Sequence, residues 1–143
     1  MARPSTAPIF PGQYDRARGT IGAAADTSFD GSDADVVEIL ECLTTQPNGY
    51  LIRKITIKAR VTTTAGQVKL YLSEDAGTTR RPWRAVLVSA VTASAAVAAF
   101  EAQLDDQNDE ELASGLVLPS GWSIVAGTHN AELIEVHVEY GIL

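Results

Sequence analysis

The side chains best placed to carry chemistry lie near the C-terminus. His137 alternates with Glu135 and Glu139 within an otherwise apolar run. Alternate residues of a β-strand point to the same face, so these three side chains cluster if the run is a strand. A zinc site wants three or four converging ligands, and no further clear ligand is in view. We therefore interpret His137 as a solvated or interface histidine, and His129, in a predicted turn, as equally ordinary.

Motifs of the common enzyme classes are missing from the sequence. The chain has no Gly-x-Ser-x-Gly, no Walker loop, no Gly-x-Gly-x-x-Gly and no His-Glu-x-x-His. We predict that the protein is not an enzyme and that it uses no cofactor. Cys42 is the single cysteine, which excludes an intrachain disulfide, and its apolar neighbours indicate a small buried hydrophobe.

Two acidic stretches and two tryptophans are the other candidates for binding. The acidic residues gather at 26–35 and 105–111, in segments that read as loops. Calcium needs six to eight oxygens at fixed geometry, and neither stretch follows the calcium-loop pattern, so we expect solvated loops. Trp83 and Trp122 are expected in the core. A carbohydrate-binding module, which uses exposed aromatic rings as platforms, is the alternative reading.

The elements that must position these residues are short strands. The strongest pattern spans 51–61, where apolar residues alternate with Lys, Thr and Arg. A turn at 64–66 and a second alternating run at 68–73 complete a predicted β-hairpin, with Lys69 and Tyr71 on its polar face. Further strands are predicted at 83–90, 97–103, 115–121, 122–128 and 132–140, whereas 36–43 fits a strand or a helix.

Eight or nine short strands separated by turns predict an all-β fold. The expected architecture is a single antiparallel β-sandwich of jelly-roll type covering residues 19–143. Residues 1–18 contain Pro4, Pro8 and Pro11, which disfavour helix and remove strand hydrogen bonds, and they predict an extended N-terminal arm. No signal peptide and no membrane span is predicted, because long apolar runs are missing.

Charge is segregated along the chain. The net charge of −7 argues against nucleic-acid binding. Residues 50–84 carry a balance of +6, whereas 19–49 carry −6 and 85–143 carry −9. If the basic strand (Lys54, Lys58, Arg60) and the acidic strand (Glu135, Glu139) are neighbours, cross-strand pairs form. If they lie on opposite sides, the molecule is electrically polar and suited to head-to-tail assembly, so these residues are predicted interface residues.

Two stretches of sequence resemble small structural proteins of tailed bacteriophages. The first stretch spans residues 86–101 and begins Val86-Leu-Val-Ser-Ala-Val-Thr-Ala-Ser. The second spans residues 115–132 and begins Gly115-Leu-Val-Leu-Pro-Ser-Gly-Trp-Ser-Ile-Val-Ala-Gly. The resemblance implies a β-sandwich virion component without enzymatic activity. Proteins of this kind include capsid decoration (cement) proteins, often trimers, and small tail, neck or baseplate components.

These observations together predict a capsid decoration protein that forms a homo-oligomer, with a trimer favoured. It is expected in the virion, assembled in the host cytoplasm, bound to the major capsid protein or another virion protein, and with neither a membrane nor a nucleic-acid partner. The predicted contacts of the arm are Ile9, Phe10 and Tyr14 as apolar anchors and Arg3, Arg16 and Arg18 facing an acidic partner. A small tail, neck or baseplate component and a carbohydrate-binding module remain the alternatives.

Overall fold

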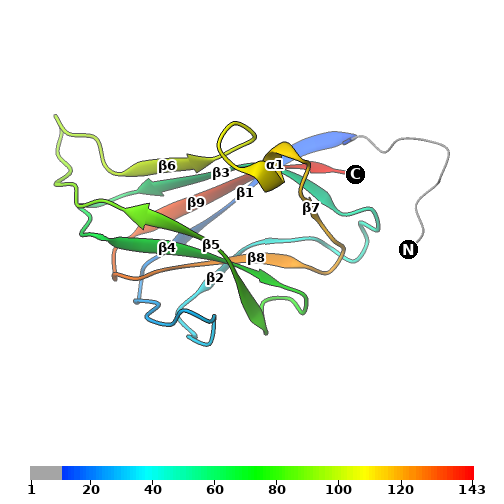
Figure 1. Ribbon diagram of the computed structural model, residues 1–143, viewed down its shortest axis with the longest axis horizontal. Helices are drawn as coiled ribbons and strands as arrows, with labels where there is room; N and C mark the ends of the chain where they lie inside the picture. Colours follow the sequence, from blue (N-terminus) through cyan, green and yellow to red (C-terminus); the bar gives the residue numbers. More distant parts are fainter. Residues whose placement is uncertain (1–10) are drawn as a thin grey trace.

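Two antiparallel β-sheets packed face to face form the protein, as the ribbon in Figure 1 shows. The structure, a computed structural model, describes residues 11–143. One sheet has the order β1-β9-β3-β6, with β7 also paired to β3, and the other has the order β2-β8-β4-β5. The elements are β1 (Gln13–Ile21), β2 (Val37–Glu41), β3 (Tyr50–Ala59), β4 (Gly66–Ser73), β5 (Arg80–Val88), β6 (Glu101–Leu104), α1 (Glu110–Ala113), β7 (Val117–Leu118), β8 (Ser123–Thr128) and β9 (Ile134–Ile142). The predicted all-β sandwich is confirmed.

The strand pairing nests from the ends of the chain inward. β1 pairs with β9, β2 with β8, β3 with β6 and β4 with β5, all antiparallel. A long hairpin folded over on itself gives this order, because each outer pair encloses the next one along the chain. This nested order agrees with the jelly roll that the sequence predicts, and the jelly roll stays a prediction.

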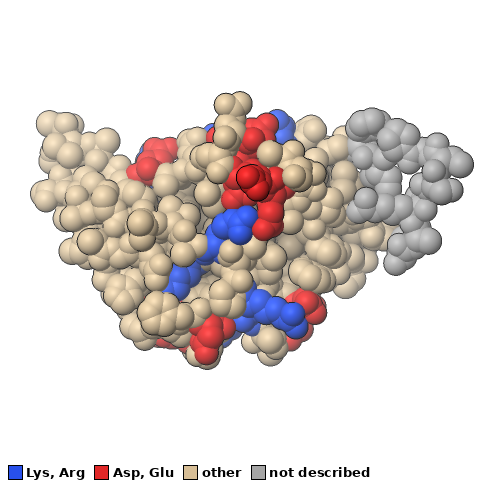
Figure 2. Space-filling view, viewed as in Figure 1, with Lys and Arg blue, Asp and Glu red and all other residues tan. Residues whose placement is uncertain are grey.

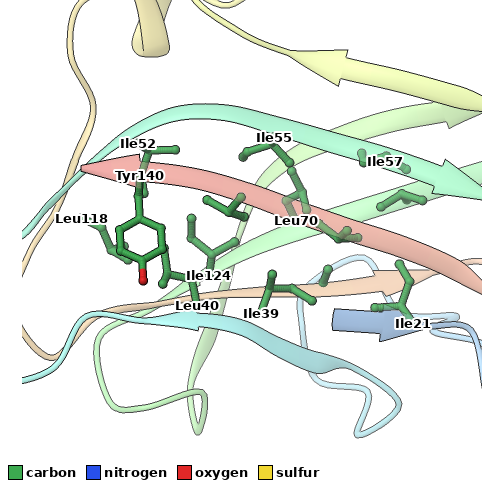
Figure 3. Close-up of a cluster of buried hydrophobic side chains, with 14 of the residues drawn as sticks. Ile21, Ile39, Leu40, Ile52, Ile55, Ile57, Leu70, Leu118, Ile124 and Tyr140 are labelled. Atoms are coloured by element: carbon green, nitrogen blue, oxygen red, sulfur yellow. The ribbon is translucent and has the colours of Figure 1, made fainter. Parts of the chain in front are cut away.

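The core lies between the two sheets and is filled mainly by β-branched and leucine side chains (Figure 3). The five-stranded sheet contributes Ile52, Ile55 and Ile57 from β3, and the facing sheet contributes Leu70 and Ile124. On β9 the alternation of buried and partly exposed residues follows the sequence pattern, with Ile134, Val136, Val138 and Tyr140 inward. The period of two in the sequence therefore identified the inward face of this strand.

The predicted hairpin of residues 51–61 and 68–73 is wrong. β3 lies in the five-stranded sheet and β4 in the four-stranded sheet, so the segment between them crosses from one layer to the other. Thr63 anchors this crossing: its backbone pairs with Val91, and its hydroxyl donates to the Ser89 carbonyl oxygen over 2.8 Å. Alternation defines which face of a strand is buried, but it carries no information about the partner strand.

The boundary of the predicted arm also differs. Residues 13–18 form most of β1, an edge strand that pairs along its whole length with β9 from Gln13 opposite Ile142 to Ile21 opposite Ile134. The prolines that suggested an extended arm end at Pro11, and Gly12 already donates from its N–H to the Ile142 carbonyl oxygen over 2.9 Å. The sandwich therefore begins six or more residues earlier than residue 19.

Two other predicted elements are shorter than expected. The strand predicted at 97–103 is observed as the shorter β6 at Glu101–Leu104, and the acidic stretch predicted as a loop at 105–111 ends within the single turn of α1. Asp109 caps this turn, because its side chain accepts from the N–H groups of Glu111 and Leu112. Trp83 and Trp122 are half-buried and pack against the core rather than within it.

None of the helices in the described residues is long and apolar enough to cross a membrane.

Candidate functional site

The outer face of the five-stranded sheet gathers most of the residues that the sequence singled out. We call this surface the charged face, and it consists of Arg16, Arg18, Lys54, Lys58, Glu135, His137 and Glu139. β9 lies in the middle, with β1 on one side and β3 on the other. Charges of opposite sign therefore stand next to one another across the strands.

The register sets the rows of the charged face. Glu139 stands between Arg16 on β1 and Lys54 on β3, and Glu135 stands opposite Lys58. The sequence left open whether the basic and acidic strands are neighbours or lie on opposite sides of the molecule. They are neighbours, which excludes the alternative in which the two strands lie on opposite sides and make the molecule electrically polar.

Direct ion pairing on the charged face is sparse. Arg16 contacts the Glu139 carboxylate, whereas no carboxylate oxygen of the described residues lies within 4.0 Å of the ammonium groups of Lys54 and Lys58. Arg60 lies beyond the end of β3, exposed, and its N–H donates to the Leu133 carbonyl oxygen over 3.0 Å. Most basic side chains of this face are thus open to an acidic partner.

His137 occupies the centre of the charged face. Its Nε2 lies 3.6 Å from a Glu135 carboxylate oxygen, and Arg18 and Thr56 stand opposite it on the two flanking strands. Over residues 11–143, no three or more His, Cys, Asp and Glu side chains are placed to hold a metal ion together. The Glu-His-Glu alternation lies between the basic residues of β1 and β3 on the charged face.

The end of β1 continues the charged face toward the N-terminal segment. Tyr14 is 56% exposed, and the Arg53 guanidinium lies 4.8 Å from the centroid of its ring. Tyr14, Arg16 and Arg18 are thus placed on a sheet edge. The other predicted contacts of the arm, Arg3, Ile9 and Phe10, lie outside the described residues.

A groove opens beside the same end of β3. It has a volume of about 370 Å³ and lies between the strand and the segment from Asp105 to Gly115. Arg53, Lys54 and Glu139 of the sheet line it, together with Asp105 and other residues of that segment. The charged face is therefore hollowed at the end of the sheet where β1 begins.

A second site, which the sequence did not indicate, lies on the outer face of the four-stranded sheet. The loop of residues 22–36 covers part of this face and carries Asp26, whose exposed fraction is 0%. The Tyr71 hydroxyl donates to Asp26 Oδ2 over 2.6 Å, and Ser28 donates to Oδ1 from its N–H and its hydroxyl. Lys69 donates from Nζ to the Asp26 carbonyl oxygen over 2.7 Å.

Lys69 and Tyr71, which were predicted on the polar face of their strand, point outward but are enclosed in this network. Both are buried, because the 22–36 loop lies over them. Desolvation and, next, the hydrogen bond to Asp26 raise the pKa of the Tyr71 hydroxyl well above its usual value. The one sequence signal was Gly127 inside a strand: a Cβ there would lie 2.6 Å from Asp26 Oδ2.

A third group of charged residues joins the edge strand β5 to α1. Arg84 of β5 donates from Nε to Asp109 over 2.9 Å and from Nη2 to Glu111 over 2.8 Å, so the edge strand is tied to α1. Trp83 Nε1 donates to the other Glu111 oxygen over 3.0 Å. The hydrogen bond from Arg84 holds the pKa of Asp109 below its usual value. Figure 2 shows the acidic side chains gathered over α1 with basic ones directly beneath.

No protein-family model fits the chain, and no characterised protein is significantly similar to it in sequence. The resemblance to phage virion proteins therefore stays a prediction that rests on the sequence pattern. The function has to be argued from the surfaces described above.

Proposed function

We propose that this protein is a non-enzymatic structural component of a phage virion, a decoration protein that oligomerises and binds the head. The charged face carries the proposal: among the described residues, Arg16 alone of its four basic side chains forms an ion pair, and the face includes the edge strand that begins at Gln13. A surface of this kind favours binding to an acidic protein partner. The resemblance of residues 86–101 and 115–132 supplies the class of partner, the major capsid protein.

The N-terminal segment is proposed to anchor the protein to the particle. Because β1 begins at Gln13, removal of residues 1–10 leaves every strand intact. We expect the truncated chain to keep the strand content and unfolding midpoint of the full chain, and to be lost from purified particles. Retention of the truncated chain on particles at the full level would overturn the anchoring role.

Self-association is proposed to involve the charged face. Light scattering after gel filtration is expected to give three times the chain mass of 15.2 kDa. The Lys58→Glu variant and salt at about 1 M, where the Debye length is about 3 Å, should both weaken the assembly. Arg81→Glu on the other sheet is the matched control, since Arg81 is also exposed. Assembly that resists both treatments would remove the electrostatic part of the proposal.

Copy number separates the head from the tail. Purified virions that contain this chain are resolved on a gel, and its band is measured against the major capsid protein. A decoration protein is present in numbers comparable with the capsid subunits, whereas a tail, neck or baseplate component is present at a far lower number. A low ratio would favour the second function.

A further inference from the structure

Phe29 is the feature that the proposed function leaves unexplained. It is 76% exposed, and the Lys69 ammonium lies 5.3 Å from the centroid of its ring. The loop that carries it is tied to the sheet on both sides: Lys69 donates to the carbonyl oxygens of Asp26 and Ser28, and Arg80 donates to those of Gly31 and Asp33. An apolar ring is thus held in water by a network that is itself largely buried.

A cavity of about 240 Å³ lies between Phe29 and Trp83. Phe29 comes from the 22–36 loop and Trp83 from β5, so the two aromatic walls are brought together only by the fold. Its further lining residues come from β4 and β5: Gln67, Lys69, Leu70, Tyr71, Pro82, Arg84 and Ala85. Sites for drug-sized ligands have volumes of about 300–1,000 Å³, so this cavity suits a ligand of about one ring.

The charges in the cavity are already compensated. The Lys69 ammonium lies 3.9 Å from Asp26 Oδ1 and also donates to two carbonyl oxygens, and Arg84 is held between Asp109 and Glu111. A phosphate or carboxylate would therefore gain little here. Arg84 has five N–H donors, and its four hydrogen bonds within the described residues leave one for a ligand.

We propose that this cavity binds a neutral sugar ring, as one unit of a glycan. The C–H face of a sugar carries partial positive charge and packs against the negative face of an aromatic ring. Phe29 and Trp83 supply the aromatic rings of the lining, and the cations of Lys69 and Arg84 each lie 5.3 Å from the centroid of one of these rings. The Gln67 amide and the remaining Arg84 N–H hydrogen-bond to the sugar hydroxyl groups. This activity goes beyond attachment to a particle and uses the sheet opposite the charged face.

The experiment is saturation-transfer NMR on the full chain with neutral sugars, each at about 10 mM: glucose, galactose, mannose and N-acetylglucosamine. We expect transfer to the C–H protons of at least one sugar, and a loss of affinity of about tenfold in Phe29→Ala. Leu87→Ala is the matched control, because Leu87 is 80% exposed on β5 and does not line the cavity. It should bind as the unchanged chain does.

A second variant keeps the test independent of folding. Trp83 packs against the core, so its replacement would disturb the sandwich. Gln67→Ala removes only hydrogen-bonding groups at the wall and should also weaken binding. The proposal is overturned if none of the four sugars gives transfer, if both variants bind as well as the unchanged chain, or if glucuronate binds more tightly than glucose. None of these results depends on particle attachment, which the truncation of residues 1–10 tests separately.

Discussion

Replacement of Asp26 by alanine tests whether the 22–36 loop is held by its buried carboxylate. The variant removes the acceptor of the Tyr71 hydroxyl at 2.6 Å and of both Ser28 donors, at 3.0 and 3.2 Å. It also leaves the Lys69 ammonium without the only carboxylate of the described residues within 4.0 Å. Removing one partner of a buried ion pair costs about 3–5 kcal/mol, because the other partner stays desolvated.

The magnitude can be checked against a smaller change at the same site. Tyr71→Phe removes one hydrogen bond to a charged group and should cost about 1.5–3 kcal/mol. Asp30→Ala is the control in the same loop: Asp30 is exposed and accepts from the Ser32 N–H over 3.0 Å, so the smallest loss of the three is expected. The order of the three losses is therefore Asp26, then Tyr71, then Asp30.

The assay is urea unfolding followed by tryptophan fluorescence and circular dichroism, with the slope unchanged and the midpoint lowered. Thermal unfolding should agree, with a midpoint lower by roughly 6–20 °C for Asp26→Ala, since a domain near this size loses about 2–4 °C per kcal/mol. If Asp26→Ala is no more destabilising than Asp30→Ala, the carboxylate is not the group that fixes the loop. The reasoning that the loop presents Phe29 in a fixed position then fails as well.

Three further predictions concern the same contacts and the edge of the sandwich. Gly127→Ala places a Cβ 2.6 Å from Asp26 Oδ2 and should cost about 1–3 kcal/mol in urea unfolding; a neutral result would mean that the loop can retreat. Asp109 has a lowered pKa in the folded chain, so its contribution is present above about pH 4 and is lost as the pH falls through the folded value. Asp109→Asn should therefore reduce the loss of stability between pH 5 and pH 2. Tyr71 has a raised pKa, so its contribution is lost as the pH rises above about 10, and unfolding midpoints of Tyr71→Phe should fall less steeply there.

The inward faces of the strands could be predicted from the sequence, whereas most of the pairings between strands could not. A strand puts successive side chains on opposite faces, so alternation with polar residues identifies the inward residues. Examples are Ile55 and Ile57 on β3, and Val136 and Val138 on β9. Lys69 lies on the outward face, as the alternation predicts, but its burial was not predicted. Its outward face is covered by a loop some forty residues earlier in the chain, and no local pattern records such a cover.

The candidate surfaces divide in the same way. Glu135, His137 and Glu139 were placed on one face by their spacing alone, and the structure confirms that placement. Their neighbours across the strands could not be predicted. Arg16 and Lys54 lie far from Glu139 in the sequence and stand beside it only because of the strand register. The aromatic cavity could be predicted even less, because Phe29 belongs to a loop and Trp83 to a strand, and nothing in the sequence indicates that the two meet.

By itself, the sequence determined the fold class, the apolar faces of most strands and the segregation of charge, because these follow from residue type and spacing. The tertiary structure alone decided which strands pair, that the segment after β3 crosses between the sheets, and that the basic and acidic strands are neighbours. It also decided that Asp26, Lys69 and Tyr71 are buried together. Such contacts join residues far apart in the chain, and their energy depends on burial, which only the complete sandwich creates.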